Sequence, residues 1–290
     1  MPSSSTLSFK TRFALATAII LWASAFVGIR IGLHGYSPGA LALLRFLIAS
    51  VCMVFVSWPV PQLVKVKRLD LFLLILVGAI GLGCYHVALN YGELTVPSGI
   101  ASFIISQSPL LTMVLAVIFL HEKFNAFALL GVIVSILGVG LIALGESHDI
   151  QFQIGMLYVL VAAFMGGFYS VMQKPFLKKY HAVHVTAYII WGATLSLCIY
   201  FPSLFREIQQ APLSATLAVI YLGIFPAAVA YVAWSYALAS VTASKVSSFL
   251  YFMPIIATLL GWVCLGEVPA FLSLVGGLVA LLGVWIANSR

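Results

Sequence analysis

Ten apolar stretches of about 20 residues each follow one another along the sequence, and short polar segments separate them. The stretches are 13–31, 38–57, 70–90, 96–119, 125–144, 155–173, 183–204, 213–237, 243–264 and 270–287. Each is long enough to cross a bilayer as a helix, and each is too continuously apolar for the alternating strands of an outer-membrane barrel. The sequence therefore predicts an all-α integral membrane protein with ten transmembrane helices.

The composition indicates that lipid bilayer surrounds most of the protein. Hydrophobic residues make up 63% of the chain and charged residues 7%, whereas soluble domains are roughly a quarter charged. The net charge of +7 does not indicate nucleic-acid binding, because the basic residues lie in loops between spans. The four cysteines lie inside apolar stretches without metal-ligand spacing. We therefore expect no metal site, no cofactor and no soluble catalytic domain.

Basic residues predict the orientation of the spans, because Lys and Arg are enriched in cytoplasmic loops. With the amino terminus inside, the cytoplasmic basic residues are Lys10, Arg12, Lys65, Lys67, Arg68, Lys123, Lys174, Lys178, Lys179, Lys245 and Arg290. Only Arg30 and Arg206 fall outside, so we expect both termini to be cytoplasmic. Residues 23–25 resemble a signal-peptidase site, but the apolar stretch continues past them, which favours a retained first span.

The sequence repeats itself at an offset of 145 residues, half its length. The matched pairs include Tyr91 with Tyr236, Ser102 with Ser247, Pro109 with Pro254, Glu122 with Glu267, Gly78 with Gly223, Gly131 with Gly276, and Gly138 with Gly283. Each half, 1–145 and 146–290, holds five spans, so the second half must enter the membrane with opposite polarity. Two inverted five-helix repeats are an architecture of secondary transporters, in which the substrate site lies near the midplane between the halves. The repeat therefore indicates alternating access.

Several of these residues form a pattern found in a known family. It consists of Pro38, Arg45, Pro109, Glu122, Gly131 and Gly138, and it recurs in part as Pro254, Glu267, Gly276 and Gly283. The pattern resembles the drug/metabolite transporter superfamily, and the paired halves resemble its EamA branch. Length and aromatic content are similar to the aromatic amino-acid exporter (YddG-like) group. The resemblance implies export of amino acids, as small-molecule substrates, across a bacterial inner membrane. The second half departs from the pattern, with Ile190 at the position equivalent to Arg45.

Two ionisable residues inside spans are candidates for binding the substrate, because such residues are costly in lipid. Arg45 either attracts a substrate carboxylate from inside a cavity or extends its side chain toward water and neighbouring carbonyls. His86 either binds substrate or a proton, since imidazole titrates near neutral pH, or packs as a hydrogen-bonded core residue. Its repeat equivalent is Tyr231. Both pairs of alternatives stay open.

Polar and aromatic residues surround His86 in the third span and recur in the eighth. The repeat relates the third span, which holds Tyr85 and Asn90, to the eighth span, which holds Tyr231 and Trp234. Two such polar and aromatic strips facing each other favour a shared cavity. Trp22, Trp191 and Trp234 lie near mid-span rather than at the interfaces where tryptophan is enriched. They form either an apolar wall for a substrate side chain or ordinary helix packing.

Pro109 and Pro254 lie inside predicted spans, where each removes a backbone donor and frees a carbonyl. Gln107 and Tyr251 lie beside these carbonyls, which bind a substrate ammonium or merely accompany a kink. The small residues Gly131, Ser135 and Gly138 in the fifth span, and Gly276, Ala280 and Gly283 in the tenth, predict close helix contact. A dimer contact is the alternative, so either a monomer or a weak homodimer is expected.

A secondary exporter of amino acids, aromatic or broad-range, or of similar metabolites is the leading hypothesis. The sequence has no phosphate-binding loop for ATP hydrolysis, and whether protons are also carried stays open. An exporter of drugs or other metabolites with the same fold is the alternative. An intramembrane enzyme is a distant one, since the paired acids or histidines that such enzymes need are missing. We therefore expect no enzymatic activity and no catalytic residue.

Overall fold

The computed structural model describes residues 8–61, 64–120, 126–146, 150–240 and 243–288, and within these ranges the chain forms helices and no strands. In the first half the elements are α1 (Phe9–Gly32), α2 (Pro38–Ser57), α3 (Arg68–Val77), η1 (Gly78–Gly83), α4 (Cys84–Gly92), α5 (Ser98–Ile105), α6 (Ser108–Leu120) and α7 (Ala126–Glu146). In the second half they are α8 (Ile150–Leu177), α9 (Ala182–Leu197), η2 (Cys198–Tyr200), α10 (Phe201–Glu207), α11 (Leu213–Leu222), η3 (Gly223–Val229), α12 (Ala230–Ser240), α13 (Ala243–Ser247), η4 (Ser248–Phe252), α14 (Met253–Leu265) and α15 (Phe271–Asn288).

Many of these elements join end to end into long apolar helices. Seven segments in the described part are long and apolar enough to cross a membrane: Phe9–Gly32, Pro38–Ser57, Arg68–Gly92, Ser98–Phe119, Gln153–Leu177, Ala182–Glu207 and Leu213–Ser240. Three shorter apolar helices, Ile133–Ile142, Phe249–Leu265 and Phe271–Gly283, lie in the other three predicted spans. The predicted all-helical membrane fold is therefore confirmed.

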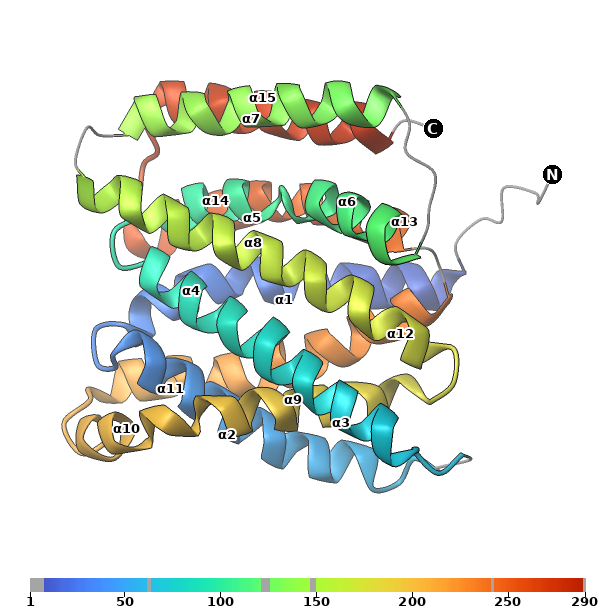
Figure 1. Cartoon of the computed structure of the whole chain (residues 1–290). Coiled ribbons are helices and arrows are strands. Elements are labelled where there is room, and N and C mark those ends of the chain that lie inside the picture. Colours follow the sequence, from blue (N-terminus) through green and yellow to red (C-terminus); the bar gives the residue numbers. More distant parts are fainter. Residues whose placement is uncertain (1–7, 62–63, 121–125, 147–149, 241–242, 289–290) are drawn as a thin grey trace.

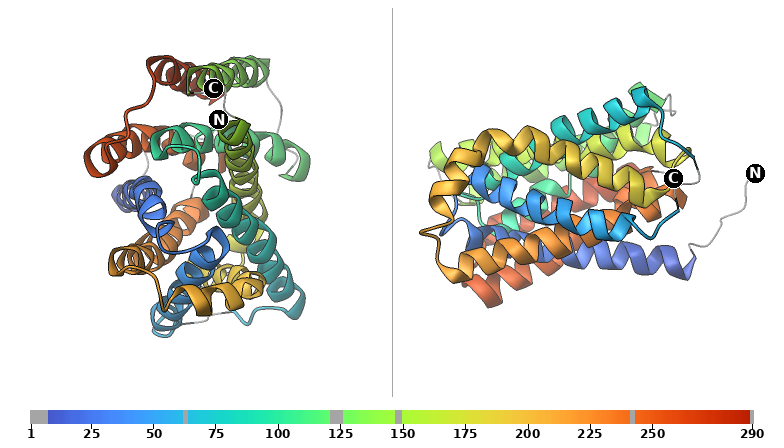
Figure 2. Two further views of the ribbon diagram at one scale, coloured as in Figure 1. Left: turned by 90° about the vertical axis from the view of Figure 1, so that its left-hand side faces the viewer. Right: turned by 90° about the horizontal axis from the view of Figure 1, so that it is seen from below.

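The long helices run roughly side by side (Figure 1), with α1 packed against α11, α12 and α14. Helices α7 and α15 pack against each other and form a separate layer at one edge of the bundle (Figure 2). The first turn of α1 and the last turn of α15 lie at the same end of the bundle. Large apolar side chains such as Trp58, Val263 and Phe271 are exposed on the outside, as lipid contact requires.

Two π-helical segments begin at glycines that the repeat relates, Gly78 in η1 and Gly223 in η3. A Cβ on Gly78 would overlap the carbonyl oxygen of Ile189 in α9. A Cβ on Gly223 would come within 2.9 Å of the carbonyl oxygen of Arg45 in α2, the helix that the repeat relates to α9. These glycines therefore let the two halves pack together in equivalent ways.

Regular α-helix is interrupted near both prolines. In the first half, α5 ends at Ile105 and α6 begins at Ser108, just before Pro109. In the second half, the 3₁₀ segment η4 leads into α14, with Pro254 in its first turn. Both interruptions fit the missing N–H donor of proline.

The small residues of the fifth and tenth predicted spans make the contact between α7 and α15. A Cβ on Gly138 would come within 2.6 Å of the Cα of Ala280, and the hydroxyl of Ser135 donates to the carbonyl oxygen of Ala280 at 2.8 Å. The predicted close helix contact is therefore confirmed, and it is made within one chain.

Candidate functional site

The interior of the bundle contains a cavity of about 650 Å³, counting the open space at its mouth. Helices from both halves line it: α1, α2, α4, α5 and α6 from the first half and α8, α12 and α14 from the second, together with η1 and η4. Six of the predicted site residues line this cavity: Trp22, Arg45, Tyr85, His86, Tyr231 and Trp234.

Arg45 brings a positive charge to the cavity wall. Its side chain comes from the middle of α2 and is only 1% exposed. Its Nε and Nη1 atoms have no hydrogen-bond partner among the described residues. A buried guanidinium without a partner is costly, because burial removes water that is not replaced. The arginine therefore has unused donors at the cavity, which suits an anionic ligand group.

His86 and Tyr231 meet across the cavity from opposite halves. The Nε2 atom of His86 and the hydroxyl of Tyr231 are hydrogen-bonded at 2.9 Å. The imidazole also makes edge contacts with Tyr85 and Phe46, at centroid distances of 4.7 and 4.8 Å. These contacts fit the packing interpretation of His86, although its ring lines the same cavity as Arg45.

Trp22 and Trp234 form an aromatic wall beside this pair. Their rings lie 5.0 Å apart, and Trp22 makes an edge contact with Tyr231 at 5.2 Å. The indole N–H of Trp22 donates to the carbonyl oxygen of Pro226 at 3.0 Å, which fixes the ring. Trp234 is 1% exposed, and its Nε1 has no partner in the described part of the chain. The wall is therefore apolar, with one indole N–H that has no partner among the described residues.

Four predicted site residues lie outside the lining of this cavity. Asn90 is buried and donates to the carbonyl oxygen of Pro38 at 2.9 Å. Gln107 is buried and donates to the carbonyl oxygen of Phe103 in α5 at 3.3 Å. The ring N–H of Trp191 donates to Ser50 at 3.3 Å, and Tyr251 packs against a small cluster around residues 110–113. Their role in substrate binding stays a prediction.

Sequence reasoning missed several cavity residues from α6 and α8. Ser108, Thr112, Tyr169 and Ser170 all line the cavity. The repeat relates α8 to α1, which carries Trp22, but it does not single out Tyr169, whose equivalent is Ser24.

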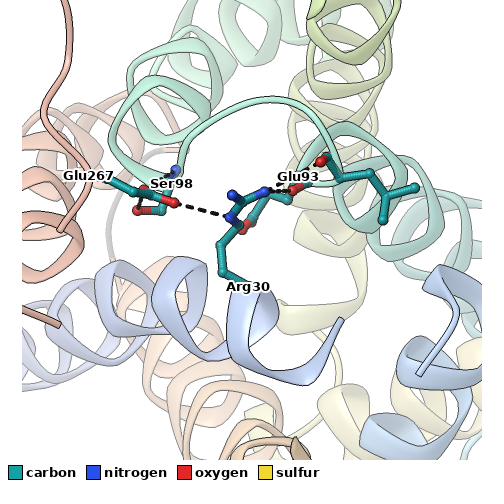
Figure 3. Close-up of polar contacts among 5 residues, drawn as sticks. Arg30, Glu93, Ser98 and Glu267 are labelled. Carbon is teal, nitrogen blue, oxygen red and sulfur yellow. Dashed lines mark hydrogen bonds and ion pairs between the residues drawn. The ribbon is translucent and has the colours of Figure 1, made fainter. Parts of the chain in front are cut away.

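An ion pair joins three segments at the left end of the bundle in Figure 1. Arg30 at the end of α1 pairs through Nε with Oε1 of Glu267 at 3.0 Å, and its Nη1 donates to the carbonyl oxygen of Glu93 (Figure 3). Glu267 Oε2 accepts from the backbone N–H and the hydroxyl of Ser98, at 2.8 and 2.5 Å. We call Arg30, Glu267 and Ser98 the clasp.

The Glu267 carboxylate caps a helix from another part of the chain. It accepts from the backbone N–H of Ser98, the first residue of α5, where a negative charge complements the helix dipole. Its repeat equivalent, Glu122, lies outside the described residues. Lys174 donates to the carbonyl oxygen of Leu238. The repeat relates Leu238 to Glu93, whose carbonyl oxygen accepts from Arg30.

A second ion pair lies at the opposite end of the bundle. Lys179 pairs with Asp70 at 3.2 Å, and the hydroxyl of Tyr180 donates to the same carboxylate at 2.6 Å. Donation to Asp70 raises the pKa of Tyr180, since losing that proton would place two negative charges together. Among the described residues, no group of three or more His, Cys, Asp or Glu side chains could hold a metal ion.

Comparisons with known proteins agree with this fold. The EamA-like transporter family matches residues 10–144 and again 153–289. A probable terminal-alkyne amino-acid exporter of Streptantibioticus cattleyicolor is 36% identical over 281 residues, covering 97% of this chain and 94% of that protein. The uncharacterized transporter YdfC of Bacillus subtilis is 39% identical over 264 residues, covering 91% and 86%.

More distant similarities extend over the same length. A probable amino-acid metabolite efflux pump of Escherichia coli is 23% identical over 280 residues, covering 92% of this chain and 91% of that protein. A solved crystal structure matches with a TM-score of 0.65 and 19% identity over 96% of both chains, which supports the fold alone. The resemblance to the drug/metabolite transporter superfamily is thus confirmed, and this multi-pass membrane protein belongs to the EamA-like transporter family.

Proposed function

We propose that the protein exports amino acids, aromatic or broad-range, as a secondary transporter that works by alternating access. The observation that carries the proposal is the unpartnered guanidinium of Arg45 in a cavity walled by aromatic rings. Two relatives named as a probable amino-acid exporter and a probable amino-acid metabolite efflux pump support the substrate class.

In this proposal the ten apolar helices form two inverted five-helix repeats, 1–145 and 146–290. Contacts between residues 145 apart support the arrangement, because a two-fold axis brings equivalent residues together. His86 meets Tyr231, and Ser135 meets Ala280. The cavity lies where the halves meet, as in other transporters built from inverted repeats.

The charge distribution supports cytoplasmic termini in a bacterial inner membrane. The first turn of α1 and the last turn of α15 lie at the same end of the bundle, which fits an even number of spans. On this orientation the clasp lies at the outer end and the Asp70 pair at the cytoplasmic end. Transport then requires the clasp to open while the cytoplasmic end closes.

The substrate fits the cavity through its two different ends. Its carboxylate binds Arg45 as a charge-assisted pair, the strongest kind of hydrogen bond available there. Its side chain packs on Trp22 and Trp234, and its ammonium donates to the hydroxyl of Tyr169, which also lines the cavity. Drug export is the alternative, but no acidic side chain lines the described cavity to attract a cationic drug.

Counterflow in proteoliposomes tests the proposal without any assumption about coupling. Vesicles loaded with one unlabelled amino acid are diluted into its labelled form, and the panel covers aromatic, aliphatic and polar amino acids and cationic aromatic drugs. We expect label to accumulate for phenylalanine and other large amino acids. Accumulation of drugs alone, or of no compound beyond protein-free vesicles, would contradict the proposal.

A further inference from the structure

Glu93 follows α4 directly and is completely buried, although the sequence places it in a loop between two spans. Neither carboxylate oxygen has a hydrogen-bond partner among the described residues. Its backbone carbonyl, in contrast, accepts from Arg30, so the residue adjoins the clasp (Figure 3). Such a buried, unpartnered carboxyl group is rare unless the environment keeps it neutral.

Three charged side chains act on Glu93 from the surrounding elements. Arg30 comes from α1, Arg45 from α2, and Glu267 from the segment between α14 and α15. Helix α8 packs along α4, and its Tyr158 stacks on Tyr91 with ring centroids 5.5 Å apart. This tyrosine adds no charge near Glu93. The two arginines favour the ionised carboxylate, whereas Glu267 opposes it.

Burial outweighs these charges and raises the pKa of Glu93 well above the usual range for glutamate. The closed clasp therefore binds a proton more tightly than an opened, hydrated one. Its stabilisation by that proton is complete below the usual pKa of glutamate and is lost as the pH rises through the raised pKa.

We propose that Glu93 is a proton-binding site that controls the clasp. With the proton bound, Arg30 pairs with Glu267 and the outer end stays closed. When the proton leaves, the Glu93 carboxylate competes with Glu267 for Arg30, and the clasp opens to hydrate the new charge. Acid on the outer side thus slows opening. The expected slowing of export on acidification depends, in addition, on the proposed transport function.

Hydrogen–deuterium exchange of residues 93–98 in the purified full-length protein tests the site without substrate. This segment includes the Ser98 amide, which donates to Glu267. After correction for intrinsic exchange, wild-type protection against exchange is expected to fall by up to about tenfold per pH unit between the usual pKa of glutamate and the raised pKa of the closed clasp, and to level off above it. Glu93→Gln mimics the protonated group and should keep the segment protected at every pH.

Glu207→Gln is the matched control, because Glu207 is also at the outer end but is only half-buried and accepts from the Ser37 amide at 2.8 Å. It should keep the wild-type pH dependence. Protection in wild type that does not change with pH, or Glu93→Gln protection that falls as in wild type, would overturn the proposal.

The infrared carbonyl band of the protonated carboxyl group in the wild type gives a second measurement if Glu93→Gln does not fold. The band should disappear at the pH where the protection levels off, and loss of the band at a clearly different pH would also overturn the proposal. A negative transport panel would contradict the proposed function and leave both measurements valid.

Discussion

The imidazole of His86 and the hydroxyl of Tyr231 are 2.9 Å apart, and the two residues are 145 positions apart in the chain. A residue meets its own repeat equivalent only close to the axis that relates the repeats. In the proposed arrangement of inverted repeats, the hydrogen bond indicates an axis beside the cavity, where Trp22 and Arg45 also lie. The proposal thus gives the duplicated sequence and the proposed site one geometric cause.

Tyr231→Phe removes this hydrogen bond and leaves a buried imidazole nitrogen without its partner. We expect a loss of about 1–3 kcal/mol in stability. Thermal unfolding in detergent should then start at a lower temperature than in the wild type. Tyr236→Phe is the control, because Tyr236 is 41% exposed. Adding His86→Leu to Tyr231→Phe should recover part of the loss, and equal midpoints for the two tyrosine variants would contradict the assignment.

Trp22→Ala and Trp234→Ala remove the aromatic wall of the cavity. Both should lower the ratio of phenylalanine to threonine counterflow by about tenfold, because only the larger side chain needs the wall. Using the ratio cancels any change in the amount of folded protein. Trp191→Ala, outside the cavity lining, should leave the ratio unchanged. A uniform loss for both amino acids would indicate that the tryptophans only pack the bundle.

Gly138→Ala tests the contact between α7 and α15. The added Cβ meets the backbone of Ala280, so we expect a loss of about 1–3 kcal/mol. Gly140→Ala in the same helix is the matched control, since nothing lies within 4 Å of its Cβ. That change should be neutral or stabilise the helix by up to about 1 kcal/mol. Similar thermal midpoints for the two variants would show that α7 and α15 do not pack as described.

Much of the cavity could be predicted because a duplicated sequence reveals which positions are equivalent. Tyr85 and His86 in α4, with Tyr231 and Trp234 in α12, were identified by comparing the halves, and all four line the cavity. Arg45 was identified because charge is costly within an apolar span. These signals are local or periodic, so they need no knowledge of how the helices pack.

The remaining features depend on packing between distant segments. Asn90 and Trp191 have the same polar or aromatic character as the cavity residues, but rotation of their helices turns them to backbone carbonyls of α2. Glu93 lies in a connecting segment that other elements bury completely, and Arg30 finds Glu267 across 237 positions. No pattern within one helix contains these relationships.

In the proposed function, recognition of the substrate depends on Arg45 binding its carboxylate. The most direct measurement is competition by phenylalanine and by phenylalaninamide, which lacks the carboxylate, against labelled phenylalanine counterflow. In the wild type, the amide should compete at least about tenfold more weakly, as expected for loss of a charge-assisted hydrogen bond. Arg206→Gln, at an exposed arginine that donates to Pro202, should keep this preference. Arg45→Gln should bind the two compounds about equally. An unchanged preference of Arg45→Gln for phenylalanine over the amide would show that Arg45 does not bind the carboxylate.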